Sequence, residues 1–476
     1  MESQDSLELY QKRIPIITRS VKGKFRRFKT TVLLLGFAVF FLLPWVPWHR
    51  AHGIPQAVAF DVTQRKFYIF NLIVYPQDVF WLAFLLFIAA VFLFFITTLL
   101  GRAFCGYFCF QTLWTDAFMF VERWMQGERS VRMKLQKQAW NGEKLVKVGG
   151  TYAIWLLISF WTGMTFVLYY GYAPDLLHRF FTGDAASAAY ITVFGLTFST
   201  LIADGFMREQ ICAYVCPYGR FQSVMYEPET LAVTYEYRRG EGKNGRIGMK
   251  GELKQREKRQ EQGYGDCIDC SICVQVCPVG IDIREGLQYR CISCGLCIDG
   301  CNEVMKSVGF PQGLIRYDSE LNAESAAPKA PHLHWKRLKV LGYFAALVVM
   351  TTGLIVDIAN EKDFECSVEQ IRQPLYVTMS NGDIRDRYEI RLTNQADESV
   401  RFHISAEGLP PGALNLGLMQ DALVHSGHSI IVDVGVELKP DQIKQYKSFE
   451  FVIQSLATDK DRVEVPMNFF SESSGI

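Results

Sequence analysis

The chain has 476 residues, a formal net charge of +1 at neutral pH and 21% charged residues. Because neither sign of charge is in large excess, we expect no nucleic acid or other polyanion as a partner. The long apolar runs instead predict a protein that lies in a lipid membrane.

Five apolar runs are long enough to cross a bilayer, which takes about 20 residues of helix. In chain order they occupy residues 30–48, 78–100, 149–171, 186–206 and 337–358. The first run does not read as a cleaved signal peptide, because 29 mostly polar residues precede it and no small-residue cleavage site follows. The sequence therefore predicts a multi-pass membrane protein with five transmembrane helices.

The distribution of Lys and Arg predicts the orientation, because segments rich in these residues are retained on the cytoplasmic side. Residues 1–29 contain eight Lys and Arg and residues 102–148 contain eight more, whereas residues 49–77 contain three and residues 172–185 contain one. We therefore expect a cytoplasmic N-terminus and, after five spans, residues 360–476 on the opposite face. The second and fourth spans both run inward, so the residues after each are expected at the cytoplasmic surface.

A short repeat follows these two spans, because CGYFC and CAYVC share the order of cysteine, small residue, tyrosine, apolar residue and cysteine. On a continuing helix, Cys105 and Cys109 would share one face, as would Cys212 and Cys216, with Cβ atoms about 5 to 6 Å apart. If the two spans are neighbours, four sulfur atoms converge. Simple packing of cysteine as a small hydrophobe is the alternative, whereas disulfides are disfavoured on a reducing cytoplasmic side.

Two further cysteine runs, at residues 267–277 and 291–301, each have the spacing C-x-x-C-x-x-C-x-x-x-C of bacterial ferredoxins. In that pattern three thiolates hold one cluster and the fourth binds the other cluster. Zinc ribbons also use C-x-x-C pairs but do not need eight cysteines in this order. The second run has Asn302 in place of the usual proline, which leaves the ligands intact. We expect one 4Fe–4S cluster on Cys267, Cys270, Cys273 and Cys301 and the other on Cys277, Cys291, Cys294 and Cys297.

The insert is expected to transfer electrons, because the potentials of iron–sulfur clusters can be tuned over a wide range, and two clusters in one insert form an electron relay.

The expected organisation thus has five parts. The parts are a cytosolic segment 1–29, a four-helix membrane region 30–230 with both CxxxC motifs, a cytosolic 2[4Fe–4S] ferredoxin-like domain with linkers 231–330, a fifth transmembrane helix 337–358, and a C-terminal domain 360–476.

The C-terminal domain is predicted to be an antiparallel β-sandwich. Segments such as YEIRLTN and SIIVDVGVEL alternate apolar and polar residues and are separated by turn-rich stretches. His425 and His428 could ligate a metal, although a histidine pair in a surface turn usually has no such role. Cys366 has no cysteine partner in this domain and is expected to be a free or packed thiol, with pairing between subunits as the alternative.

The order of these parts resembles the CcoG/FixG/RdxA family of cytochrome oxidase accessory proteins. The resemblance rests on CGYFC, CAYVCP, the dicluster ferredoxin insert and the C-terminal sandwich in combination. It implies a bacterial inner-membrane protein that reduces Cu(II) to Cu(I) for assembly of a cbb-type cytochrome oxidase, with the oxidase or its copper-delivery proteins as partners. It also implies an immunoglobulin-like C-terminal domain in the periplasm. Related NapH and NosR membrane ferredoxins act as electron conduits, and many of that wider group have proline where this chain has Phe110.

Copper chemistry fits the residues, because Cu(I) prefers soft thiolates and Cu(II) prefers nitrogen and oxygen ligands. Electrons would pass from the clusters to copper held by the four cysteines of the CxxxC motifs. A quinol-linked conduit, whose membrane cysteines form a disulfide relay or bind a further cluster, and a non-catalytic assembly scaffold are the alternatives. The sequence contains no dinucleotide-binding fingerprint and no P-loop, so it does not name the electron donor. It leaves the oligomeric state open, with a homodimer among the options.

Overall fold

The computed structural model describes most of the chain as two compact units. They comprise Met1–Trp48 with Gln56–Thr352 and His49–Pro55 with Gly353–Ile476. The described residues are 16–50, 53–63, 65–75, 78–325, 330–360, 364–380, 382–394, 399–417, 421–425, 427–443, 445–456 and 462–470. The first 15 residues of the expected cytosolic segment therefore lie outside the described part of the chain.

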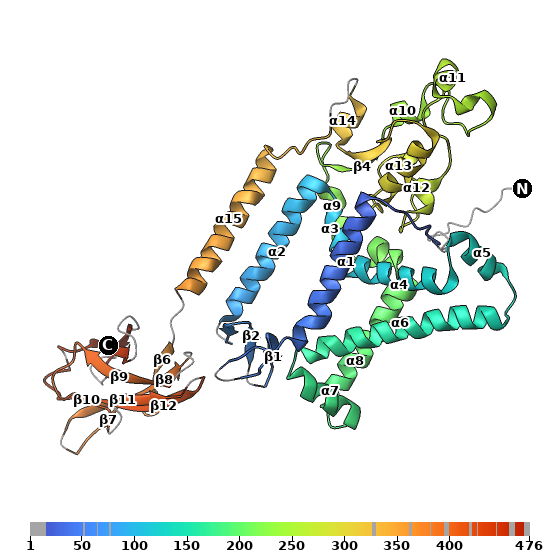
Figure 1. Ribbon diagram of the computed structural model, residues 1–476. Coiled ribbons are helices and arrows are strands. Elements are labelled where there is room, and N and C mark those ends of the chain that lie inside the picture. Colours follow the sequence, from blue (N-terminus) through green and yellow to red (C-terminus); the bar gives the residue numbers. More distant parts are fainter. Residues whose placement is uncertain are drawn as a thin grey trace, which may run out of the picture. The chain divides into compact units, whose positions relative to one another are not determined.

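The five predicted membrane helices are confirmed by length and composition (Figure 1). They are α1 (Lys24–Leu42, continued by a 3-10 turn Leu43–Trp45), α2 (Val79–Leu100), α6 (Gly142–Leu168), α8 (Ser187–Thr200, continued by a π-helical segment η3, Leu201–Met207) and α15 (Leu338–Ala359). The largest differences are at helix starts. Helix α6 begins seven residues before the apolar run because the Asn141 side chain accepts a hydrogen bond from the Lys144 backbone N–H and caps its first turn.

Helix α1 also begins before its apolar run, at Lys24. Its charged first turns contact protein: Arg26 and Lys29 both lie within ion-pair distance of Asp116, and Lys29 is fully buried. A buried charge needs such a partner, because its desolvation is otherwise costly.

Elements that the apolar pattern did not predict fill the space between the spans. Helix α4 (Phe110–Gln126) is amphipathic and packs against α6, where the Trp114 indole donates to Thr162 at 2.9 Å. A small antiparallel sheet joins the first two spans, formed by β1 (Val58–Asp61), β2 (Lys66–Ile69) and β3 (Leu72–Val74). The other elements here are α3 (Ala103–Tyr107), α5 (Arg129–Lys137), α7 (Ala173–Thr182), the π-helical turn η4 (Ile211–Val215) and α9 (Pro217–Met225).

The cysteine-rich insert is built around a two-stranded antiparallel sheet of β4 (Ala232–Tyr235) and β5 (Ile315–Asp318). Its core contains several of the cysteines together with apolar side chains such as Ile283 and Leu314. The insert also contacts α1, because the Arg26 backbone N–H donates to Asp299 at 2.8 Å. Its helices are α10 (Tyr237–Glu241), η5 (Gly251–Lys254), α11 (Arg256–Glu261), α12 (Ile272–Gln275), η6 (Ile283–Glu285), α13 (Leu296–Val308) and α14 (Glu320–Glu324).

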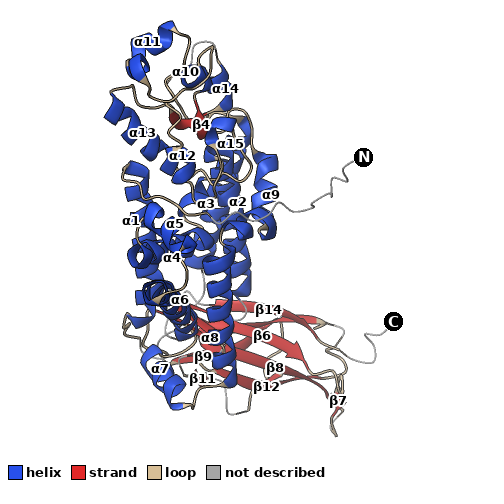
Figure 2. Ribbon diagram, turned by 90° about the vertical axis from the view of Figure 1, so that its right-hand side faces the viewer, coloured by secondary structure: helices blue, strands red, loops and turns tan. Residues whose placement is uncertain are grey.

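The second unit contains the predicted antiparallel sandwich, with strands in two sheets (Figure 2). One sheet has the order β10-β12-β8-β6 with β7 paired to β8, and the other has the order β11-β9-β13-β14. Alternate side chains such as Tyr388 and Phe451 are fully buried between them. The strands are β6 (Phe364–Gln370), β7 (Val377–Thr378), β8 (Ile384–Asn394), β9 (Val400–Glu407), β10 (Leu414–Asn415), β11 (Asp421–Val424), β12 (Ser429–Leu438), β13 (Ser448–Ser455) and β14 (Arg462–Asn468).

Candidate functional site

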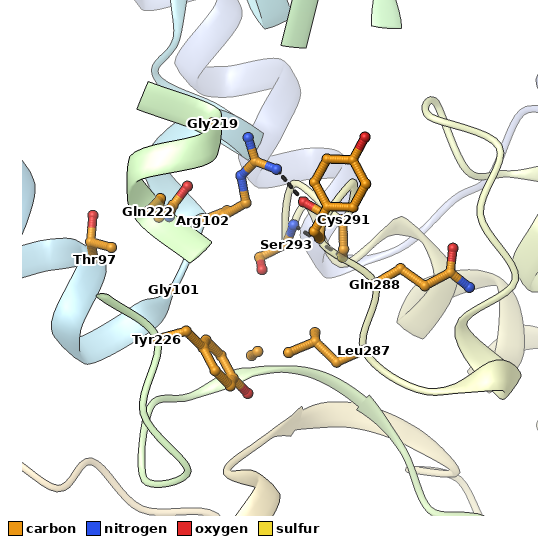
Figure 3. Close-up of a pocket in the computed structure, with 12 residues that line it drawn as sticks. Thr97, Gly101, Arg102, Gly219, Gln222, Tyr226, Leu287, Gln288, Cys291 and Ser293 are labelled. Atoms are coloured by element: carbon orange, nitrogen blue, oxygen red, sulfur yellow. Dashed lines mark hydrogen bonds between the residues drawn. The ribbon is translucent and has the colours of Figure 1, made fainter. Parts of the chain in front are cut away.

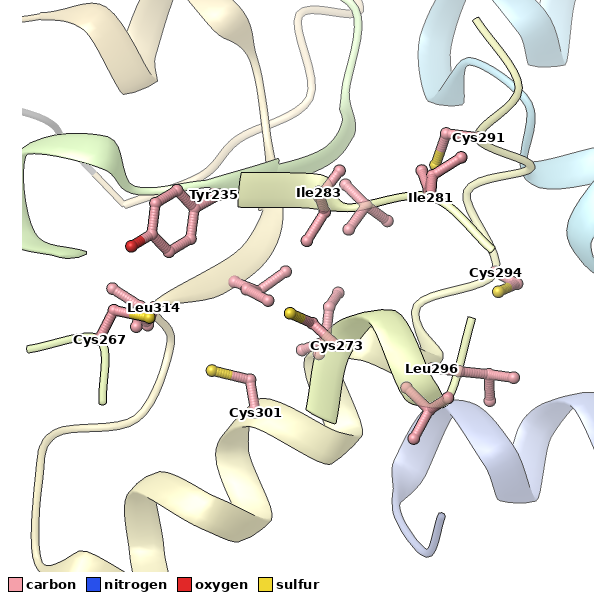
Figure 4. Close-up of a cluster of buried hydrophobic side chains, with 14 of the residues drawn as sticks. Tyr235, Cys267, Cys273, Ile281, Ile283, Cys291, Cys294, Leu296, Cys301 and Leu314 are labelled. Atoms are coloured by element: carbon pink, nitrogen blue, oxygen red, sulfur yellow. The ribbon is translucent and has the colours of Figure 1, made fainter. Parts of the chain in front are cut away.

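The eight cysteines of the insert form two spatial groups. In Figure 4 the sulfur atoms of Cys267, Cys273 and Cys301 face a common space. Cys270 is close enough to interact electrostatically with both Cys273 and Cys301, and it is the exposed member of this first group. Three members come from one sequence run and Cys301 comes from the other, on helix α13.

The second group lies around a small cavity at the base of the insert. The cavity is lined by Cys277, Cys291, Cys294 and Cys297, and Cys273 of the first group also borders it. Three of the four members again come from one run, and Cys277 comes from the other. The two groups therefore have the crossed composition that the ferredoxin spacing leads one to expect.

The backbone between the cysteines turns tightly. Asp269, Ser271 and Ser293 have positive φ values of 51°, 54° and 49°, a conformation that is uncommon for residues other than glycine. One result is that the Ser293 backbone N–H points at the Cys291 sulfur, at 3.4 Å. Hydrogen bonds of this kind to sulfur are among the factors that tune iron–sulfur potentials.

The chemistry of these thiols fits bound iron–sulfur clusters. Burial raises the pKa of Cys273, Cys277 and Cys301 to about 12, so the metal-free side chains would be neutral at physiological pH. Iron binds thiolates, and the positive charge of a metal centre offsets the cost of burying them. Both groups could therefore hold a 4Fe–4S cluster.

The first CxxxC motif does not lie on one continuous helix, so that prediction was wrong. Helix α2 ends at Leu100, and Gly101 follows with a φ of 56°. Cys105 lies in the short helix α3, whereas Cys109 is the extended residue, with φ −65° and ψ 130°, that precedes α4. Gly101, whose positive φ is favoured for glycine, ends the span. The short helix α3 and the extended residue Cys109 then replace the single helical face that the spacing suggested.

The second CxxxC motif has the same local structure. Cys212 lies in η4, and Cys216 is an extended residue, with φ −73° and ψ 114°, before α9. Helix α9 begins with Pro217 and α4 begins with Phe110. Proline is favoured at the first position of a helix but is not required there, so Phe110 is accommodated without a different turn. The sequence repeat is therefore also a structural repeat.

The two repeats lie against each other. A Cβ atom added to Gly219 would lie 2.7 Å from the Arg102 guanidinium and 2.8 Å from the Cys212 carbonyl oxygen. Burial raises the pKa of Cys105 to about 12 and that of Cys212 to about 11, and the nearby Cys109 thiol also raises the pKa of both. Cys105, Cys109 and Cys212, which come from the two repeats, are thus close enough to interact electrostatically, and Cys105 is buried.

Cys216, the fourth cysteine of the repeats, interacts electrostatically with Cys212. Within the described part of the chain, no three or more His, Cys, Asp and Glu side chains, those of the two repeats included, are arranged to hold a single metal ion.

Arg102 was not identified from the sequence, yet it joins the repeats to the second cysteine group. It donates a hydrogen bond to the Tyr289 carbonyl oxygen, and its charge lowers the pKa of both Cys105 and Cys291. The available signal was its place three residues before Cys105, just after the second apolar run. Only the fold brings Cys291 to the same arginine.

The remaining candidates lie in the second unit. Cys366 is on β6, and burial raises the pKa of its thiol to about 12. The His425 ring shares a hydrogen bond of 3.0 Å with the Ser399 hydroxyl, and its centroid is 6.4 Å from that of His428. We assign no ligand role to these residues.

Three protein families match parts of the chain. A 4Fe–4S dicluster domain family matches residues 207–320, a 4Fe–4S binding domain family matches residues 82–128, and a family described as an IG-like fold at the C-terminal of FixG matches residues 354–472. The first match contains Cys212 and Cys216 as well as the eight insert cysteines, and the second contains Cys105 and Cys109.

Several characterised sequences are similar over most of the chain. Protein RdxA of Cereibacter sphaeroides is 40% identical over 84% of this chain and 84% of its own length. Protein RdxB of the same organism is 41% identical over 86% of this chain and 85% of its own length. Nitrogen fixation protein FixG of Rhizobium meliloti is 36% identical over 93% of this chain and 87% of its own length.

Proposed function

The chain belongs to the FixG/RdxA family of membrane iron–sulfur electron-transfer proteins, and from that premise we propose that it passes electrons from two 4Fe–4S clusters to Cu(II). The acceptor site is formed by the cysteines of the two CxxxC repeats. Its product, Cu(I), would serve the assembly of a cbb-type cytochrome oxidase, directly or through copper-delivery proteins.

The eight insert cysteines would hold the clusters in the crossed arrangement. When bound, the clusters supply one-electron redox chemistry. The protein contributes buried thiols, a Ser293 backbone N–H aimed at the Cys291 sulfur and a core that shields the centres from solvent. We propose Cys267, Cys270, Cys273 and Cys301 as the ligands of one cluster and Cys277, Cys291, Cys294 and Cys297 as the ligands of the other.

The observation that carries the proposal is the direct contact between the first repeat and the second cysteine group. The Tyr107 hydroxyl donates to the Cys294 carbonyl oxygen at 2.8 Å. Gly106 approaches the same loop so closely that an added Cβ would lie 2.6 Å from the Ile292 carbonyl oxygen. The route from this cluster to Cys105 therefore crosses a packed interface with no intervening element.

Thiolate ligands favour the reduced ion. Each Cu(II) takes one electron to become Cu(I), and soft sulfur binds Cu(I) in preference to Cu(II). A site formed by Cys105, Cys109, Cys212 and Cys216 would thus raise the copper potential and make the transfer more favourable. Arg102 assists by lowering the pKa of Cys105, since the metal binds the thiolate.

The arrangement in the membrane is also part of the proposal. The sixteen Lys and Arg of residues 1–29 and 102–148 support a cytoplasmic N-terminus and cytoplasmic clusters in a bacterial inner membrane. The immunoglobulin-like domain would then be periplasmic, because an odd number of spans separates it from the N-terminus.

A second candidate is an electron conduit in which the four repeat cysteines bind a further iron–sulfur cluster. The match of residues 82–128 to a 4Fe–4S binding domain favours it, because that segment contains Cys105 and Cys109 and none of the eight insert cysteines. The two candidates differ in what the repeat cysteines hold.

A reoxidation experiment separates them. Anaerobic protein is reduced with dithionite, freed of reductant on a desalting column and mixed with Cu(II) and a Cu(I)-specific chelator. We expect one Cu(I) per reoxidised cluster in the wild type. The C105S/C109S variant should keep its insert clusters and lose this reaction, because hard oxygen replaces half of the soft ligands, and C366S serves as the matched cysteine control.

Other outcomes are equally informative. Copper reduction at the wild-type rate in C105S/C109S would refute the copper site. A loss of about four iron atoms with the insert clusters intact would favour the conduit. Clusters that do not cycle in a redox titration would mean that the insert is structural.

A further inference from the structure

A cavity of about 190 Å³ lies beside the second cysteine group, and its lining residues do not include the four repeat cysteines. It is bounded by the end of α2, by α9 and by the loop that leads to Cys291. Figure 3 shows its labelled side chains around a common space. The lining includes Arg102, Gln222, Tyr226, Leu287 and Cys291.

Three residues that line this cavity have buried polar atoms without a hydrogen-bond partner. Gln222 is 2% exposed, and neither its amide nitrogen nor its amide oxygen has a hydrogen-bond partner. The Tyr226 hydroxyl and the Arg102 Nε are also buried without one. Buried polar groups are nearly always hydrogen-bonded in native proteins, so three such residues around one cavity indicate a polar ligand.

The lining defines the chemistry of that ligand. Arg102, Tyr226 and the Gln222 amide offer donors, and the Gln222 carbonyl offers an acceptor. The positive charge of Arg102 disfavours a metal cation, and Leu287 and Ala232 give apolar walls. An apolar cavity of about 150 Å³ is large enough for a benzene ring, so this one accommodates a single substituted ring that carries oxygen atoms.

We propose that this cavity binds the headgroup of a membrane quinone and that the reduced form is the electron donor of the protein. The inference rests on the proposed electron-transfer function and adds the donor to it. Cys291 lines the cavity, so a bound ring would lie next to a ligand of the second cluster. On α9, the apolar side chains of Phe221 and Val224 are 58% and 85% exposed, which offers a surface for an isoprenoid tail.

The electrons and protons released by oxidation of the hydroquinone are all accounted for. Oxidation of a hydroquinone breaks its two O–H bonds, forms two carbonyl groups and releases two electrons and two protons. With both clusters bound, the electrons would be taken up one at a time by the centre that Cys291 helps to hold and then by the other, so that two one-electron centres match one two-electron donor. The protons pass to water at the mouth of the cavity, where Leu287 and Tyr289 are exposed.

Binding is tested with ubiquinone-0, a tail-free benzoquinone, titrated into detergent-solubilised holoprotein by calorimetry. We expect Q222L to weaken binding at least tenfold and Y226F to weaken it severalfold, because each removes a hydrogen bond to the ring oxygens. Q138L, which changes an exposed glutamine outside the cavity, should bind as the wild type does.

The stability of Q222L provides a second readout. Since the amide has no partner in the free protein, leucine should leave the thermal midpoint and the iron content unchanged or improved. Wild-type affinity in Q222L, absence of binding to the wild type, or displacement of ubiquinone-0 by a short-chain phosphatidylglycerol would overturn the proposal.

The test also separates this inference from the copper proposal. In Q222L, duroquinol should no longer reduce the clusters, whereas clusters reduced with dithionite should still reduce Cu(II) as in the wild type. Loss of both reactions in Q222L would assign Gln222 to the clusters and overturn the quinone site. Normal duroquinol reduction of the wild type without Cu(I) formation would retain the quinone site and refute the copper site alone.

Discussion

The Tyr107 hydroxyl donates a hydrogen bond to the Cys294 carbonyl oxygen, at 2.8 Å, across 187 positions of sequence. Tyr107 belongs to the helix that carries Cys105, and Cys294 belongs to the second ferredoxin run. The first CxxxC repeat and the loop that contains Cys294 are therefore held together as one structural unit. Substitutions at their interface should affect how the second cysteine group binds its cluster.

Gly106 gives the most direct test of this interface. An alanine there would place its Cβ 2.6 Å from the Ile292 carbonyl oxygen and 3.0 Å from the Cys294 Cα, both of them backbone atoms. We expect G106A to lose the second cluster and keep the first, so that iron falls from about eight to about four atoms per chain. Anaerobic iron analysis and electron paramagnetic resonance measure this. G195A is the control, because a Cβ at Gly195 meets nothing within 4 Å, and an equal loss in both variants would contradict the prediction.

The crossed ligand sets predict how cysteine substitutions combine. Because Cys277 and Cys291 are assigned to the same cluster, C277S/C291S should retain about as much iron as C291S alone, roughly four atoms per chain. Cys301 is assigned to the other cluster, so C277S/C301S should lose both clusters and nearly all iron. If each run instead bound its own cluster, C277S/C291S would also lose both clusters and nearly all iron, so this variant separates the two arrangements. Zinc in the place of iron would reject the ferredoxin assignment altogether.

Arg102 should set the pH dependence of copper binding. Its charge lowers the pKa of Cys105, which burial raises to about 12, and copper binds the thiolate. In R102Q the pKa of Cys105 should rise further, so Cu(I) binding at neutral pH should weaken severalfold and its pH profile should move to higher pH. R102K keeps the charge and should resemble the wild type. Coincident profiles for R102Q and the wild type would exclude this role.

The orientation can be tested with reporter fusions. A reporter active only in the periplasm should give signal when fused after Ile476, which lies outside the described residues, and none when fused after Gly309. The physical reason is the retention of the sixteen Lys and Arg of the two inner segments. A cytoplasm-specific reporter at the same two positions is the control. Signal at Gly309 alone would show that the topology is inverted.

The sequence by itself determined the parts of this protein. The five spans, the eight ferredoxin cysteines and the alternating strands of the sandwich depend on composition and spacing within short segments. An apolar run can lie in lipid only if its backbone N–H and C=O groups are hydrogen-bonded to one another, as they are in a helix. Iron–sulfur ligation requires thiolates at short, fixed separations. Such constraints are local, so they are visible without the fold.

The tertiary structure decided how these parts meet. The i, i+4 spacing of Cys105 and Cys109 predicted one helical face, but Gly101 ends α2, Cys105 lies in the short helix α3 and Cys109 is an extended residue before α4. Gln222 carries no sequence signature and Arg102 has only its place near Cys105, since their roles depend on the loop leading to Cys291, which lines the same cavity. Contacts between residues distant in sequence arise from packing and burial, which no single segment encodes. These contacts determine the pKa values of the thiols and decide which polar atoms of the cavity have no hydrogen-bond partner.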